Sequence, residues 1–272
     1  MMARRRDFVK SALLMSGASL CGPRAAASSL ADATIQLTPL QKFVRIRCSE
    51  AGRRTSWWYS GQLLGRIGDT ALRPLFSIVG ASQTIGQWQD DGSFRYEMVE
   101  AGYYGDPDTG ESADGPIINP LTGEMVQPQH YLSPQTIVFT PDLKVIPDRA
   151  VSPDVGNFSG TITPPDEKGD RIWMAERLMG QLYATAERGN RVFNSLANFE
   201  ASQSDVRAES GFVPASMQYT TFNSFRPWMK MKDAVGNISS RLNALKLDRW
   251  SGVALSLRDR IKTDHPGVFI DD

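Results

Sequence analysis

Apolar and polar positions alternate over short stretches through the first half of the chain, and turn residues separate these stretches. Such runs, rich in β-branched and aromatic residues, favour pleated strands, while Gly, Pro, Asp and Asn supply the backbone angles that tight turns need. The predicted strands are Trp57–Tyr59, Pro74–Val79, Phe94–Val99 and Thr136–Phe139. The predicted turns are Asp90–Ser93, Gly105–Asp108 and Thr140–Asp142. The pattern predicts a meander of antiparallel strands.

The segment 170–209 has two interpretations. Ile172–Leu178 consists of residues that a helix accepts. However, Glu167–Asp170 and Glu187–Asn190 are similar turn sequences, and each precedes an apolar, aromatic run. We favour hairpin strands because they explain this repetition better than two helix ends.

The rest of the pattern predicts extended chain over Phe212–Phe225 and a helix over Val253–Lys262, ended by Pro266. The proline-rich stretch Pro141–Pro165 is either a linker or a long loop crossing a barrel rim. We therefore predict a mainly β fold: a large antiparallel β-barrel or sandwich, calycin-like, with a short C-terminal helix. No composition shift marks a boundary, so residues 28–272 are predicted to form a single β-rich domain.

The first 27 residues have the layout of a twin-arginine export signal. Arg5 and Arg6 precede a short apolar stretch, Ser11–Gly22, and Ala25–Ala27 suit cleavage. The apolar stretch is shorter than the roughly 20 residues that a membrane-spanning helix needs. These features predict export of a folded protein to the periplasm, with the twin-arginine translocase as its partner during export.

Charge and cysteine content narrow the classes of partner. The signal region carries five basic residues and one acidic residue, so removing it from the neutral 272-residue chain leaves a net charge of about −4. Nucleic acid and anionic membrane surfaces are disfavoured, because both attract basic proteins. No later apolar run predicts a membrane anchor, and the oligomeric state stays open, a homo-oligomer included.

Cys48 is the last residue of Phe43–Cys48, a segment that alternates like a strand. Its position in this segment predicts a buried, inert thiol.

Two turn sequences, Asp106–Glu111 and Asn119–Glu124, repeat the same arrangement of Asx, Pro, Thr, Gly and Glu. They predict two similar loops at one end of a barrel. Alternatively, their carboxylates surround a mouth and perform acid–base chemistry or hold calcium. An EF-hand loop has its glycine at the sixth position, whereas Gly110 is fifth, so calcium is the weaker alternative.

The candidate catalytic residues lie around these turns. His130 follows the second turn and is the best general base, since its ordinary pKa lies near neutrality. Tyr103 or Tyr104 is expected to hydrogen-bond a developing oxyanion, and Asp106 or Glu124 to orient the histidine. Residues expected to contact the substrate are Trp57, Trp58, Trp88, Asn119 and Trp228. With two histidines in the chain and no nucleotide-binding or nucleophile motif, we predict no metal site and no organic cofactor.

Several of these segments together resemble a bacterial family known as domain of unknown function eighteen thirty-eight. The resemblance rests on Trp57–Gly61, Gly102–Tyr104, the two repeated turns, His130 and Phe225–Met229. It implies a β-rich fold and frequent export, and it brings no reaction or catalytic set.

We therefore expect a periplasmic, cofactor-independent enzyme acting on a small apolar or aromatic molecule in a barrel pocket. Its reaction class would be lyase, isomerase or hydrolase, by acid–base catalysis. The alternative is a periplasmic protein that binds such a molecule without transforming it. A metal-containing fold is a third hypothesis.

Overall fold

The computed structural model describes residues 36–148, 157–182, 191–209, 211–231 and 234–271, and Ile35–Asp272 forms one compact unit. The predicted signal, residues 1–27, and the turn at Glu187–Asn190 lie outside the described residues. The strands are β1 (Thr55–Ile67), β2 (Arg73–Trp88), β3 (Phe94–Gly105), β4 (Ile117–Ile118), β5 (Met125–Val126), β6 (Tyr131–Phe139), β7 (Lys144–Pro147), β8 (Asn157–Ile162), β9 (Asp166–Lys168), β10 (Arg171–Leu182), β11 (Arg191–Ser202), β12 (Ala215–Asn223) and β13 (Gly236–Leu247). The α-helices are α1 (Pro39–Cys48), α2 (Gln203–Arg207) and α3 (Leu255–Asp264).

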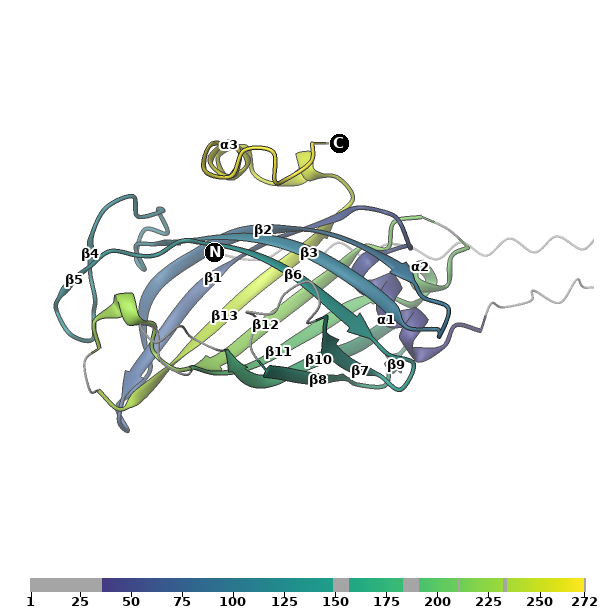
Figure 1. Cartoon of the computed structure of the whole chain (residues 1–272), viewed down its shortest axis with the longest axis horizontal. Helices are drawn as coiled ribbons and strands as arrows, with labels where there is room; N and C mark the ends of the chain where they lie inside the picture. Colours follow the sequence, from purple (N-terminus) through teal and green to yellow (C-terminus); the bar gives the residue numbers. More distant parts are fainter. Residues whose placement is uncertain (1–35, 149–156, 183–190, 210, 232–233, 272) are drawn as a thin grey trace, which may run out of the picture. The chain divides into compact units, whose positions relative to one another are not determined.

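Within the described residues, ten antiparallel strands form a closed β-barrel in the order β1-β2-β3-β6-β7-β8-β10-β11-β12-β13. Pairing of β13 with β1 completes the ring, so open sheet edges among the described strands occur only where pairing is partial, as in the first half of β6. The small β4–β5 hairpin lies at one end of the barrel, α1 and α2 lie at the other, and α3 lies outside along β2 (Figure 1). The predicted mainly β fold with a short C-terminal helix is confirmed. Of the two predicted architectures, barrel and sandwich, the structure has the barrel.

The described residues of the disputed segment form strands β10 and β11, followed by the short helix α2. β10 and β11 pair antiparallel over twelve residues, from Arg171 opposite Ser202 to Leu182 opposite Arg191. Met174 and Glu176 therefore share one face of the sheet and Trp173 lies on the other, as expected for a strand. Gly169, at φ 58°, makes the turn that precedes β10. The proline-rich stretch is neither linker nor plain loop, since it contributes β7 and β8 to the barrel wall.

One sequence prediction is wrong: the segment containing Phe43–Cys48 is helix α1, and no strand forms there. Thr38 and Gln41 form a capping box, in which the Gln41 N–H donates to Thr38 Oγ1 at 3.2 Å and the Thr38 N–H donates to Gln41 Oε1 at 2.8 Å. Pro39 occupies the first turn, where its missing N–H costs nothing. These local signals start a helix, and burial of its apolar face stabilises the helix despite the short strand-like alternation in Phe43–Cys48.

Helix α1 fills one end of the barrel with apolar side chains. Phe43 packs edge-on against Phe139 of β6, with ring centroids 5.2 Å apart, and against Phe199 of β11 at 5.6 Å. Lys246 of β13 donates to the carbonyl oxygens of Arg45 and Ile46 at 2.8 and 2.6 Å, at the helix end where a cation is favoured. The core therefore begins at α1 and continues along the barrel axis.

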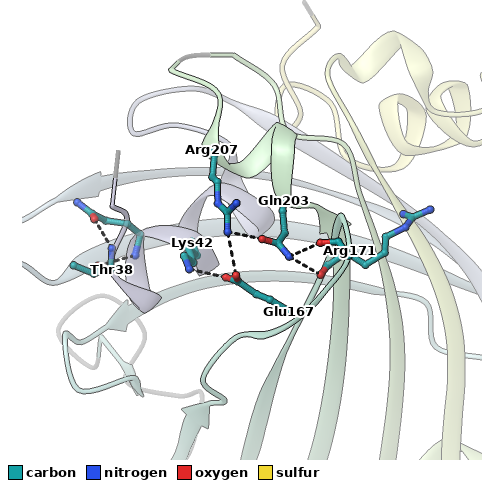
Figure 2. Close-up of polar contacts among 8 residues, drawn as sticks. Thr38, Lys42, Glu167, Arg171, Gln203 and Arg207 are labelled. Atoms are coloured by element: carbon teal, nitrogen blue, oxygen red, sulfur yellow. Dashed lines mark hydrogen bonds and ion pairs between the residues drawn. The ribbon is translucent and has the colours of Figure 1, made fainter. Parts of the chain in front are cut away.

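Polar contacts also tie α1 to neighbouring elements at this end (Figure 2). Lys42 of α1 donates to Glu167 of β9 at 2.6 Å, and Arg207 of α2 donates to the other oxygen of Glu167 at 3.1 Å. Arg207 also donates to Gln203, whose amide in turn donates to the carbonyl oxygen of Arg171 at 3.3 Å. The carboxylate thus bridges two helices that are more than 150 residues apart in the chain.

Candidate functional site

The barrel contains a cavity of about 560 Å³, and Arg47 of helix α1 is one of its lining residues. Its wall combines apolar side chains with aromatic hydroxyls and four charged groups, a composition typical of small-molecule sites. The apolar and aromatic part of the wall includes Trp57, Tyr59, Ile78, Tyr96, Met98, Tyr131, Leu178, Phe193, Met217, Tyr219 and Leu242. Among the described lining residues, the charged groups are Arg47, Glu100, Glu176 and Arg226.

The cavity approaches the surface along the first half of β6. In the described part of the chain, β6 pairs with β7 only from Ile137 to Phe139, while its earlier residues pair with β3 alone. Leu132 and Gln135 of this half line the cavity, and Leu132 is 37% exposed. The cavity therefore extends to this half of β6.

Two tyrosines meet inside the barrel across four neighbouring strands. Tyr59 of β1 lies opposite Gly80 of β2, Gly80 lies opposite Gly102 of β3, and Gly102 lies opposite Tyr131 of β6. A Cβ atom at Gly80 would come within 2.2 Å of the Tyr59 hydroxyl, and one at Gly102 within 2.3 Å of the Tyr131 ring. The two glycines thus leave space in which the tyrosine rings lean toward each other. Their hydroxyl oxygens are 2.8 Å apart.

Glu100, two residues before Gly102 on the same inward face, extends this pair. The Tyr131 hydroxyl contacts Glu100 Oε1 at 3.3 Å, and the Tyr59 hydroxyl donates to the carbonyl oxygen of Ala101 at 3.3 Å. Glu100, Tyr131, Tyr59 and the Ala101 carbonyl form a chain of three hydrogen bonds, which we call the Glu100 relay. Three hydrogen bonds need three hydrogens, and the two hydroxyls supply only two. With a proton on Glu100 all three hydrogen bonds form; with Glu100 ionised, the Tyr131 hydroxyl donates to Glu100 Oε1 and the two hydroxyls make two of the three.

Electrostatics favour the protonated form of Glu100. Burial raises the pKa of Glu100, and this effect exceeds the opposing effects of its hydrogen bonds to the two tyrosines and of Arg47 and Arg226. Burial, followed by the nearby Glu100, also raises the pKa values of Tyr59 and Tyr131 well above their usual range. Glu100 is one of the residues that line the cavity. The site therefore presents a carboxyl group with a raised pKa and two tyrosine hydroxyls to the cavity.

A second polar centre lies at the floor of the cavity. Arg47, in the last turn of α1, places its Nε atom 3.4 Å from Glu176 Oε2 of β10, and both side chains are at least 90% buried. The guanidinium lies over the rings of Tyr96 and Phe199, at 4.9 and 5.1 Å from their centroids. Opposite charges here offset each other, because a buried charge is costly unless it is paired.

Arg226 differs from Arg47, because no described carboxylate pairs with it. It precedes the 3₁₀ turn Pro227–Met229, and its guanidinium lies 5.9 Å from the centroid of the Tyr104 ring. Its Nε is buried without a hydrogen-bond partner among the described residues, and the side chain lines the cavity. Its charge lowers the pKa values of Glu100 and Tyr131, which places it within electrostatic reach of the relay.

The structure brings His130 and Tyr103 together, but away from the cavity lining. Their rings are 5.1 Å apart, and Tyr103 packs outside the barrel in a cluster with Leu257 and Ile261 of α3. The Tyr104 N–H donates to His130 Nδ1 at 3.1 Å, and Nε2 lies 3.1 Å from the carbonyl oxygen of Ala113. This pattern needs the neutral tautomer with hydrogen on Nε2.

Burial, and then the nearby Arg260, lower the pKa of His130, in keeping with that neutral form. Both ring nitrogens face main-chain groups, so neither of these two hydrogen bonds reaches Asp106 or Glu124. Tyr104 points to the opposite side of β3, where its ring packs 6.4 Å from that of Phe76. The arrangement holds the loop before β6 in place.

The repeated turns are both present as loops. Asp106 accepts from the N–H groups of Asp108 and Thr109 at 2.9 and 2.8 Å, and these hydrogen bonds lower the pKa of its carboxyl. The two turns share one main-chain hydrogen bond: the Asp106 N–H donates to the carbonyl oxygen of Glu111, and the Asn119 N–H donates to that of Glu124, each at 2.9 Å. Within the described ranges, no three or more His, Cys, Asp or Glu side chains are grouped to hold a metal ion.

Of the predicted substrate-contacting residues, Trp57 lines the cavity, and its Nε1 donates to the Arg47 oxygen at 3.1 Å. Trp58 packs outside with the cluster beneath α3, and Trp88 is 40% exposed. Trp228 packs at a tilt against the rings of Phe76 and Tyr104, with centroids 5.1 and 5.2 Å away. Asn119 holds the segment after Trp228 by donating to the Met229 oxygen at 2.8 Å.

Sequence reasoning missed Glu100, Tyr59, Tyr131, Arg47 and Arg226 as site residues. The available signal was Gly80 and Gly102, which follow the predicted strands Pro74–Val79 and Phe94–Val99 and lie inside β2 and β3, because glycine within a strand often marks a close approach. Cys48 is buried, and burial raises the pKa of its thiol to about 12, as an inert cysteine requires.

The sequence matches no model of a known protein family, and no curated protein matches it. The resemblance to the family numbered eighteen thirty-eight stays a prediction. No helix in the described residues is both long and apolar enough to cross a membrane.

Proposed function

We propose that the protein is an enzyme that binds a small, largely apolar or aromatic molecule in the barrel cavity and transforms it by acid–base catalysis. The observation that carries this proposal is the Glu100 relay, with oxygen–oxygen distances of 2.8 and 3.3 Å inside the cavity. A carboxyl group with a raised pKa exchanges protons near neutral pH more readily than an ordinary glutamate. No organic cofactor is needed for such chemistry.

Each relay member has a distinct role in the proposed reaction. Glu100 donates a proton to the bound molecule, or takes one after losing its own. Tyr131 and Tyr59 then reverse the direction of their hydroxyl hydrogens, so that Tyr131 donates to the ionised Glu100. A hydroxyl released from the relay also stabilises an oxyanion on the substrate. Lyase and isomerase reactions use such proton transfers directly, and hydrolysis needs an added water.

The proposed catalytic residues therefore differ from those expected from the sequence. His130 has both ring nitrogens directed to main-chain groups, whereas Glu100, Tyr131 and Tyr59 face the cavity. The alternative is a protein that binds the molecule without changing it. A wall that is largely apolar, apart from the relay and the charged groups, favours that alternative.

Location in the periplasm belongs to the same proposal. It is supported by Arg5 and Arg6, followed by the apolar stretch and the small residues Ala25–Ala27. Substituting both arginines by lysine should leave the full-length protein inside the cytoplasm, as shown by cell fractionation. Export of the double variant at the normal level would contradict the twin-arginine route.

The enzyme proposal is tested with a panel of small carbonyl and aromatic compounds in D₂O. Binding is measured by thermal shift, and reaction by proton NMR, which detects both turnover and exchange of carbon-bound hydrogen for deuterium. Glu100→Gln should reduce turnover or exchange by about 10²-fold or more while binding is kept. Glu97→Gln is the matched control, because Glu97 lies on the outer face of the same strand.

The two functions give different results in this experiment. Exchange or turnover that depends on Glu100 supports the enzyme. Compounds that bind and are neither exchanged nor converted support the binding protein. Activity that survives in Glu100→Gln but disappears in His130→Ala would return the catalytic role to the histidine.

A further inference from the structure

The charges that face the cavity do not sum to zero once the relay is protonated. Arg47 and Glu176 form one buried ion pair at the cavity floor, 3.4 Å apart. In the form of the relay with all three hydrogen bonds, Glu100 carries the third hydrogen and is neutral. Of the four charged groups in the described lining, Arg226 then remains as a positive charge without a counterpart.

Arg226 is also held in a position that suits ligand binding. Its Nε is buried without a hydrogen-bond partner among the described residues, so a donor that water cannot easily reach faces the interior. The guanidinium lies over the Tyr104 ring, and the Tyr104 ring centroid is 6.1 Å from that of Tyr131. Asn223 of β12, whose Oδ1 is buried and unpaired, lines the same cavity.

We propose that the molecule bound in the cavity is an organic monoanion, a carboxylate on an apolar or aromatic skeleton, and that Arg226 binds its carboxylate. Arginine suits this role because its planar donors match both oxygens of a carboxylate. The apolar skeleton occupies the space between Ile78, Met217 and Leu242, within reach of the Glu100 relay. This inference rests on the proposed function, since it names the substrate class of the same cavity.

Glu100 decides whether the charge argument holds. An ionised Glu100 would neutralise the cavity, and an anionic ligand would then gain no advantage over a neutral one. Glu100→Gln separates the two states, because it removes a charge only if one is present. The substitution should leave the affinity for an anion unchanged when Glu100 is neutral, and should raise it when Glu100 is ionised.

Two fluorescent probes with one skeleton test the proposal: 8-anilinonaphthalene-1-sulfonate, an anion, and N-phenyl-1-naphthylamine, its neutral counterpart. The anionic group of the first probe stands in for the carboxylate. Each is titrated into the full chain at neutral pH, and competition between them shows that they share one site. In Arg226→Gln the affinity for the anionic probe should fall about tenfold or more, while the neutral probe binds as before. Arg241→Gln, on the outer face of β13, is the control and should change neither affinity.

The outcomes separate this inference from the proposed function. If each probe binds wild type and Arg226→Gln with the same affinity, the anion site is overturned and the cavity proposal stands. A rise of about tenfold in anion affinity in Glu100→Gln would also overturn it, by showing that Glu100 is ionised. Failure of both probes to bind a folded protein would overturn the cavity proposal itself. Circular dichroism and the melting temperature confirm that each variant is folded.

Discussion

The hydroxyl oxygens of Tyr59 and Tyr131 lie 2.8 Å apart, although the two residues belong to strands that are not neighbours. Two strands, β2 and β3, separate them, and each contributes a glycine to the row between the rings. Side chains at those positions would keep the tyrosines apart. The contact therefore depends on four residues in one register, and a shift of one residue in any pairing would remove it.

Gly102→Ala should destabilise the protein, because the three atoms nearest to the added Cβ all belong to the Tyr131 side chain, at 2.3–2.5 Å. Overpacking of this kind costs about 1–3 kcal/mol. Urea denaturation of Gly102→Ala, Tyr131→Ala and the double variant measures the coupling, and the cost of the new methyl group should largely vanish in the Tyr131→Ala background. Gly115→Ala is the control, since its Cβ would meet open space. Equal costs in both backgrounds would contradict the account.

The buried pair of Arg47 and Glu176 should be costly to break and cheaper to replace. Glu176→Gln leaves the guanidinium in the interior without its carboxylate, and we expect a loss of about 3–5 kcal/mol in the free energy of unfolding. Replacing both residues by leucine should cost less than the single change.

The matched control for this prediction is the pair of Arg171 and Glu200, whose side chains are 61% and 36% exposed. Breaking an exposed pair of this kind costs about 0–1 kcal/mol. A similar cost for Glu176→Gln would show that the floor of the cavity admits water. Denaturant midpoints at one pH are sufficient for the comparison.

Helix α1 should contribute most of its stability through Phe43. Phe43→Ala removes two edge-on ring contacts from a fully buried site and should cost about 3–5 kcal/mol. Thr38→Ala removes only the capping contact and should cost about 1 kcal/mol. Thermal unfolding of both variants tests this order, and a smaller effect for Phe43→Ala would mean that α1 is not a true part of the core.

The stability of the unliganded protein should fall as pH rises through the folded-state pKa of Glu100. Burial raises this pKa, so the folded protein keeps a proton that the unfolded chain has already lost. The stability gained from this proton is fully present below the unfolded pKa and is lost above the folded pKa. Its size is about 1.4 kcal/mol for each unit by which the pKa is raised. Glu100→Gln should remove this pH dependence, and an unchanged profile in that variant would contradict the prediction.

The fold was largely predictable from the sequence because its signals are local. Glycine-containing turns and aromatic strands defined the meander, and the hairpin interpretation of 170–209 is confirmed by the pairing of β10 with β11. The α1 prediction failed although Thr38-Pro39-Leu40-Gln41 is a capping-box sequence, because a short alternation in Phe43–Cys48 was given more weight.

The candidate site was not predictable by the same reasoning. Tyr59, Glu100 and Tyr131 come from three strands, and only the register of the barrel places them together. No spacing in the sequence encodes that register. His130 and the repeated turns were conspicuous because they are close in the chain, and the structure places them in loops and outer clusters away from the cavity lining.

The most direct test of the account is to measure the protonation state of Glu100. NMR of ¹³C-labelled side-chain carboxyl groups during a pH titration makes this measurement. Glu100→Gln assigns the signal by its absence. The account predicts that this carboxyl stays protonated after the exposed glutamates have ionised near their ordinary pKa of about 4.3. A signal that titrates at or below that ordinary value would contradict the relay, and with it the proposed acid and the uncompensated charge of Arg226.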